Sequence, residues 1–151
     1  MEAFVVVGGG FLLAVLWFDL MFDVQAHGQG DAELPEAVLT SIAGYYRRVT
    51  TTARPMNRLV AAAMLWTLAA IVVELATDDV AAWAGWVSLA LALTAMVIGA
   101  MRTVPAAVRM GARSDTVAEQ SRRARAILRD HVVCLVLIVA LIAVQLVSAT
   151  S

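Results

Sequence analysis

The stretch that decides the fold is residues 17–27, WFDLMFDVQAH, where charged side chains first appear within the first apolar run of the chain. On a helix, Asp19, Asp23 and His27 would form one stripe, because they are spaced four residues apart. Carboxylates are costly inside hydrocarbon unless they face protein or water and find partners. This stripe is therefore the first candidate site, and the rest of the chain has to accommodate it.

The composition places the chain among membrane proteins. Of its 151 residues, 62% are hydrophobic and 15% are charged, and the mean hydropathy is +0.83. This length allows about four spans of ~20 residues with short connections. The formal net charge of −1 argues against nucleic acid as a partner, because phosphate binding needs a concentrated basic surface.

We predict an all-α fold, an integral membrane four-helix bundle that forms a single domain over residues 1–151. Its transmembrane helices are expected at about residues 3–26, 56–76, 80–103 and 129–148. The longer connections then cover about residues 27–55 and 104–128. Helix is also expected to continue past Pro105 to Gly111, and Ser114 is the expected N-cap of the last helix.

Apolar residues recur at helical spacing after the first span, at Leu34, Val38, Ile42, Tyr45 and Val49. This pattern predicts a short amphipathic interfacial helix on the membrane surface, with the tyrosines at headgroup level. A helix that docks on a partner is an equally good interpretation of the same pattern.

Small and polar residues indicate how the spans pack. The run Gly8-Gly9-Gly10 predicts a notch for a neighbouring helix. The second span has a small-residue face that ends in Glu74, which we expect to reach interfacial water. In the last span, a stripe of His131, Cys134, Ile138 and Gln145 predicts a polar seam.

The arginines predict the orientation. Residues 24–58 and 102–129 carry four and seven of the eleven basic residues, whereas the turn between spans two and three carries only acids. The positive-inside rule places both basic connections in the cytoplasm and both termini outside a cell (inner or plasma) membrane. Glu2 and the aspartates of the first span favour a retained anchor over a cleaved signal peptide.

With this topology, each span brings polar residues to one layer at its cytoplasmic end. The predicted ion- or ligand-binding layer consists of Asp19, Asp23, Asn57, Arg58, Arg102 and Asp130, and the predicted metal ligands are Asp19, Asp23, His27 and His131.

Three interpretations of this layer compete. In the first, Asp19 and Asp23 pair with Arg58 and Arg102 in a purely structural network. In the second, the layer holds a divalent metal ion or, less plausibly, haem between the two histidines, as in a small membrane oxidoreductase. In the third, it is a proton or ion pathway or a small-substrate pocket in which Asp19 titrates.

A rival from another class is an accessory or scaffold subunit of a larger membrane complex. The partners expected from the sequence are the lipid bilayer and either further copies of the chain, as a homo-oligomer, or a membrane-complex partner. A nucleophilic hydrolase is the weakest enzyme hypothesis, because no Gly-x-Ser-x-Gly elbow occurs.

Overall fold

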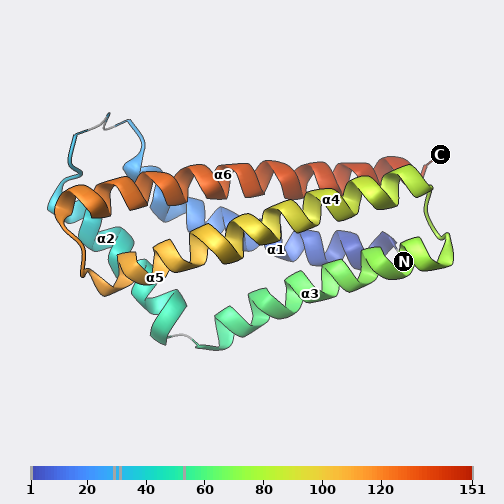
Figure 1. Ribbon diagram of the computed structural model, residues 1–151, viewed down its shortest axis with the longest axis horizontal. Helices are drawn as coiled ribbons and strands as arrows, with labels where there is room; N and C mark the ends of the chain where they lie inside the picture. Colours follow the sequence, from blue (N-terminus) through green and yellow to red (C-terminus); the bar gives the residue numbers. More distant parts are fainter. Residues whose placement is uncertain (1, 29, 31, 53, 151) are drawn as a thin grey trace.

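The computed structural model describes residues 2–28, 30, 32–52 and 54–150, and the side chains of all of these except 54–56. Over these residues the chain is helical and has no strand. The elements in chain order (Figure 1) are α1 (Glu2–Asp23), the 3-10 turn η1 (Val24–Ala26), α2 (Glu36–Arg47), the π-helical turn η2 (Arg48–Thr52), α3 (Arg54–Thr77), α4 (Ala82–Ile98), the π-helical turn η3 (Gly99–Thr103), α5 (Val104–Ala112) and α6 (Val117–Ser148).

Within the described residues, four stretches are long and apolar enough to cross a membrane: Glu2–Ala26, Asn57–Thr77, Ala82–Ala112 and Val117–Ser148. They coincide with the four predicted spans, which confirms an all-α fold with four helices suited to a bilayer. The last two contain 31 and 32 residues, whereas a span needs ~20. Both are therefore long enough to project beyond the hydrocarbon, as predicted.

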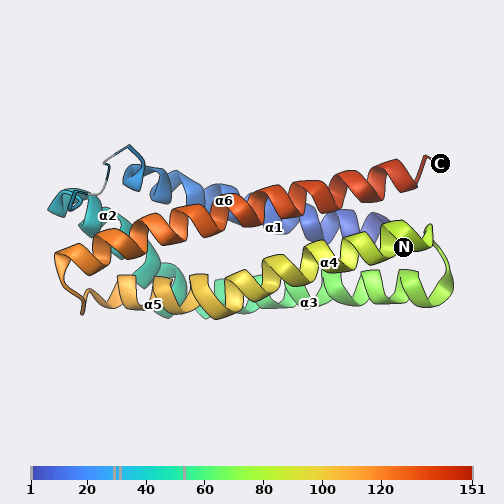
Figure 2. The same cartoon turned by 45° about the horizontal axis from the view of Figure 1, so that its top comes forward.

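The long helices run side by side along the molecule (Figures 1 and 2). Both termini and the α3–α4 turn lie at one end, called here the termini end. Helices α2 and α5 lie at the other, called the α2 end, where α2 crosses the bundle obliquely. Only residues 78–81 separate α3 from α4, so the predicted antiparallel hairpin of the middle spans is confirmed.

The long helices expose large apolar side chains along their most apolar stretches. Leu65, Val136 and Met101 each expose more than half of their surface, at 67%, 59% and 74%. Between 22% and 28% of the most apolar window of each long helix is buried inside the protein. Such extensive apolar exposure is unusual for a soluble domain and suits contact with lipid.

Glycines in α1 let two neighbouring helices approach closely. A side chain at Gly8 would collide with the Thr67 hydroxyl of α3, and a Cβ at Gly9 would lie 3.1 Å from Ile142 Cγ1 of α6. At Gly10 a Cβ would have no atom within 4 Å. The predicted notch is confirmed for the first two glycines, and it seats α1 between α3 and α6.

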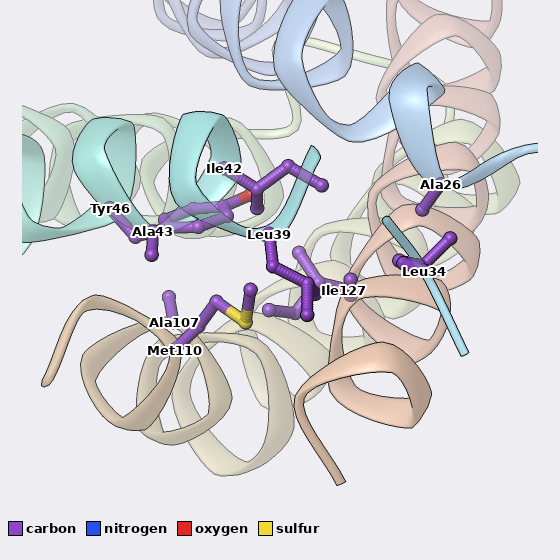
Figure 3. Packing of buried hydrophobic residues seen from close by; sticks show 10 residues of the cluster. Ala26, Leu34, Leu39, Ile42, Ala43, Tyr46, Ala107, Met110 and Ile127 are labelled. Carbon is purple, nitrogen blue, oxygen red and sulfur yellow. The ribbon is translucent and has the colours of Figure 1, made fainter. Parts of the chain in front are cut away.

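Helix α2 packs on protein through its apolar face. Leu39, Ile42 and Tyr46 are buried against Met110 of α5 and Ile127 of α6 (Figure 3). The sequence predicted instead a helix whose apolar face lies on the membrane. That expectation was wrong about the surface contacted, because amphipathic periodicity does not distinguish a lipid surface from a protein groove.

The approach of α2 to α5 depends on one glycine. A Cβ at Gly111 would lie 2.7 Å from the backbone nitrogen and 2.9 Å from the Cα of Arg47. Backbone atoms cannot rotate away as a side-chain end can. Gly111 therefore sets the distance between α5 and the end of α2.

Helix continues from α4 into α5 through a π-helical turn. Pro105 follows this turn in the first turn of α5. Proline has no N–H to donate to the preceding turn, and the irregular hydrogen-bond spacing of the π-helical turn stands directly before it. The expected extension to Gly111 is confirmed, because α5 ends at Ala112. π-Helical turns are a recognised way for a long helix to change direction without ending.

The N-cap of α6 is Thr116, whose hydroxyl accepts a hydrogen bond from the Glu119 backbone N–H at 3.3 Å. The expectation that Ser114 caps this helix was therefore wrong by two residues. Asp115 instead accepts hydrogen bonds from Arg109 and Arg123 at 2.6 and 2.7 Å. The hydrogen bond from Arg109 is the main reason why the pKa of Asp115 lies below its ordinary value.

The interior face of α6 carries the predicted stripe. His131, Cys134, Ile138 and Gln145 are all buried, together with Leu141. Polar groups are buried at the two ends of this stripe, while its middle packs in an apolar cluster with residues such as Ile71 and Leu12. Two separate polar sites therefore share one helix face.

Candidate functional site

The site lies at the α2 end, where side chains from three helices meet. Asp19 and Asp23 stand one turn apart on α1, His131 faces them from α6, and Tyr45 and Tyr46 approach from α2. We call these five residues the Asp–His–Tyr cluster. Asp23 is completely buried, His131 is buried, and Asp19 retains 16% exposure of its side chain.

His131 lies between the two carboxylates. Its Nδ1 is 2.6 Å from Asp23 Oδ2, and its Nε2 is 3.7 Å from Asp19 Oδ2. Only an imidazolium carries N–H groups on both ring nitrogens. A doubly protonated His131 would therefore donate to Asp23 and attract Asp19 at the same time, while a neutral ring could serve only one of them as donor.

Each tyrosine donates its hydroxyl to one carboxylate. Tyr45 donates to Asp19 Oδ1 at 2.5 Å, and Tyr46 donates to Asp23 Oδ1 at 2.6 Å. Burial, together with the neighbouring carboxylates, raises the pKa of both phenols. Both therefore stay protonated and act as donors. Tyr45 is held in place by stacking on Phe22, with ring centroids 4.1 Å apart.

The ion pairs differ from those predicted. Arg102 donates to Asp130 at 2.9 Å, while Asp19 and Asp23 are bonded to tyrosine and histidine. The predicted pairing of these two aspartates with Arg58 and Arg102 was therefore wrong. Tyrosine and histidine donors satisfy these carboxylates inside the protein, whereas Arg102 remains half exposed and can stay hydrated.

The predicted layer is only partly assembled. Asp19, Asp23 and His131 come together as expected, and Arg102 with Asp130 forms a second pair nearby on η3 and α6. His27 follows η1 and is exposed, so it lies outside the cluster. Asn57 donates to the Thr50 carbonyl at 2.9 Å. Arg58 is exposed.

The metal hypothesis gains no support from this arrangement. Among the described residues, no group of three or more His, Cys, Asp and Glu side chains is arranged to hold a metal ion. Both ring nitrogens of His131 face carboxylates, and His27 lies apart from it in an exposed turn. The described part of the chain therefore contains neither a set of ligands for a divalent metal ion nor a bis-histidine haem site.

Sequence reasoning missed the tyrosines as site residues. It placed Tyr45 and Tyr46 at headgroup level, but Tyr46 is 2% exposed and bonded to Asp23. One signal was available. Two phenols at adjacent positions match two carboxylates one helical turn apart, if the short helix crosses the end of the first span.

The cluster combines two acids, one base and two phenols, most of them buried. Such a set can hold and pass a proton, because each member is linked to another by one hydrogen bond or one short electrostatic contact. Comparison of the chain with protein-family models, with curated proteins and with solved structures found no match.

Proposed function

We propose that this chain is a small multi-pass protein of the cell membrane, and that the Asp–His–Tyr cluster is a proton-binding site near the cytoplasmic ends of its helices. The observation that carries the proposal is the position of His131, with one ring nitrogen 2.6 Å from Asp23 and the other 3.7 Å from Asp19.

Charge favours a bound proton. With a neutral imidazole, the ionised cluster would hold two negative charges in surroundings of low polarity. With an imidazolium the cluster holds one net negative charge, and each carboxylate has a positive charge beside it. Because uncompensated buried charge is costly, the protonated form is favoured. Asp130, next to His131 in sequence, is already paired with Arg102.

Asp19 is the group best placed to exchange this proton with water. It is the more exposed of the two aspartates, and its distance from the imidazole is 1.1 Å longer than that of Asp23. Asp23, fully buried and bonded on both oxygens, acts as the fixed partner that orients the ring. This assignment develops the third sequence hypothesis, in which Asp19 titrates.

The proposed orientation follows from charge. The arginines of η2, η3, α5 and the first half of α6 gather at the α2 end, while both termini lie at the other end (Figure 1). By the positive-inside rule the α2 end faces the cytoplasm and the termini face outside. The exposed apolar side chains of the long helices support lipid as the immediate partner. A homo-oligomer or a scaffold role in a larger complex stays a prediction.

The ring of His131 can be followed directly, because the chain has only one other histidine, the exposed His27. Protein labelled with ¹⁵N at histidine is placed in lipid nanodiscs, and both ring signals are followed against pH. We expect the His131 ring to carry protons on both nitrogens at neutral pH, and Asp19→Asn should change its titration.

The matched control is Asp79→Asn, in the turn at the opposite end of the molecule, which should leave the His131 titration unchanged. If the His131 ring is neutral at neutral pH, or if its titration is indifferent to Asp19→Asn, the proposal is wrong. In that case the cluster is a structural network alone.

A further inference from the structure

A second buried polar site lies at the termini end. Glu74 of α3, Ser88 of α4 and Gln145 of α6 are each 0% exposed. Gln145 Nε2 donates to Glu74 Oε2 at 3.1 Å and to Ser88 Oγ at 3.0 Å. The expectation that Glu74 reaches interfacial water was therefore wrong, because the side chain turns inward to meet α4 and α6.

This site is incomplete in hydrogen bonds. Glu74 Oε1 and Gln145 Oε1 are both buried, and neither has a hydrogen-bond partner among the described residues. Both are acceptors when Glu74 is ionised, so neither can satisfy the other. Leaving a buried polar atom without a partner costs on the order of 1–3 kcal/mol, and more when the atom carries charge. Native proteins therefore contain few such atoms.

No basic side chain among the described residues acts on an ionised Glu74. Three charged groups act on it electrostatically: Glu2 of α1 and Asp79 of the α3–α4 turn, which are negative, and the amino group of the chain, which is positive. Ser88 and Gln145 are uncharged, and the arginines belong to the connections of the other end. An ionised Glu74 would thus be a buried carboxylate with no described basic side chain beside it.

We propose that Glu74 binds a proton at neutral pH and forms a carboxylic acid–amide pair with Gln145, a proton-binding site separate from the Asp–His–Tyr cluster. A proton on Glu74 Oε1 converts that oxygen into a donor and gives the Gln145 carbonyl the donor it lacks. With the amide N–H already on Oε2, acid and amide then share two hydrogen bonds, and Ser88 receives the second amide hydrogen.

A proton fits this site better than a metal ion. One carboxylate, one amide and one hydroxyl supply too few oxygens for Ca²⁺, which takes six to eight, or for octahedral Mg²⁺. A divalent ion would also leave an uncompensated positive charge. A single proton cancels the charge of Glu74 and satisfies both orphaned oxygens.

The two sites are distinct. His131 and Gln145 lie 14 positions apart on α6, which is about 21 Å along a helix. Between them the interior is apolar and includes Ile138, Leu141 and Ile71. The Glu74 site can therefore be tested without reference to the function proposed for the other cluster.

The test is the infrared spectrum of the whole protein in lipid vesicles, because a protonated carboxylic acid has a carbonyl stretch that ionised carboxylates lack. Labelling with ¹³C at the glutamate carboxyl separates glutamates from aspartates. The other four glutamates, Glu2, Glu33, Glu36 and Glu119, are not buried. We expect a ¹³C-shifted acid band at pH 7 in the wild type.

Variants assign this band. It should disappear in Glu74→Gln, move in frequency in Gln145→Leu, which removes the amide, and persist in the surface control Glu33→Gln. If the labelled wild type has only carboxylate bands at pH 7, the proposal is overturned, and this result needs no variant to fold. Loss of the band when sodium chloride replaces choline chloride at constant pH would also overturn it, since the occupant would then be a sodium ion.

Discussion

Replacing Gly111 by alanine should destabilise the protein, although alanine is the better helix former. Gly111 lies in the last turn of α5, and the added Cβ would meet the Arg47 nitrogen at 2.7 Å, the Arg47 Cα at 2.9 Å and the Tyr46 carbonyl carbon at 3.1 Å. All three are backbone atoms of α2. Relief therefore requires the whole end of α2 to move away from α5.

The size of the effect follows from two opposing contributions. Overpacking a well-packed contact costs typically about 1–3 kcal/mol. Replacing glycine by alanine within a helix returns up to ~1 kcal/mol, and less near a helix end. The net destabilisation should be about 1–2 kcal/mol, so that the equilibrium constant for unfolding rises roughly tenfold, since about 1.4 kcal/mol is a factor of ten.

Gly44→Ala is the matched control. Gly44 lies within α2, and no atom lies within 4 Å of the position of its Cβ, so that only the helix-forming gain applies there. Both variants are compared by reversible unfolding in mixed detergent micelles, followed by tryptophan fluorescence. We expect Gly44→Ala to stabilise and Gly111→Ala to destabilise. Equal stabilisation by both would refute the close backbone approach of α2 and α5.

Three further predictions concern other contacts. Tyr46→Phe removes a buried donor to a carboxylate and should lower the free energy of unfolding by about 1.5–3 kcal/mol, measured in the same assay. The hydrogen bond from Arg113 lowers the pKa of Glu36 below its ordinary 4.5. The contribution of this ion pair to the free energy of unfolding is therefore complete above pH 4.5 and is lost as the pH falls through the lowered pKa of Glu36. The stability difference between the wild type and Arg113→Gln should shrink over that pH range, and a constant difference would contradict the ion pair. The Cys134→Ser variant has no cysteine, so Asp79→Cys can be added to it as a single reactive thiol. This thiol should react with an impermeant maleimide added outside intact cells. A thiol that does not react would reverse the proposed orientation.

The spans were predictable because a bilayer imposes a length and an apolar composition that can be read from the chain. Residues Glu2–Ala26 and Asn57–Thr77 begin and end within a residue or two of expectation. The buried stripe of α6 was predictable for a similar reason, since helical spacing alone places His131, Cys134 and Gln145 on one face.

The partners of the polar groups were not predictable, because hydropathy does not fix the rotation of a helix about its axis. Opposite charge suggested that Asp19 and Asp23 would pair with arginines. The structure gives these acids the phenols of α2 instead. This outcome depends on where α2 docks, and the docking depends on Gly111, more than sixty positions away in the sequence.

The two polar sites differ in the charges around them, and this difference predicts different chemistry. At the α2 end, two carboxylates share one imidazole and two phenols, and the Arg102–Asp130 pair lies close by on the neighbouring helices. Carboxylates with that many donors can stay ionised when buried. Among the described residues, Glu74 has one amide donor and no basic side chain beside it, which is why we propose the neutral acid there. A proton at the α2 end is therefore expected to reside on the base, whereas at the termini end it is expected on the acid. Spectra of the histidine rings and of the glutamate carboxyl report these two protons separately, and a variant at either site should leave the other signal unchanged.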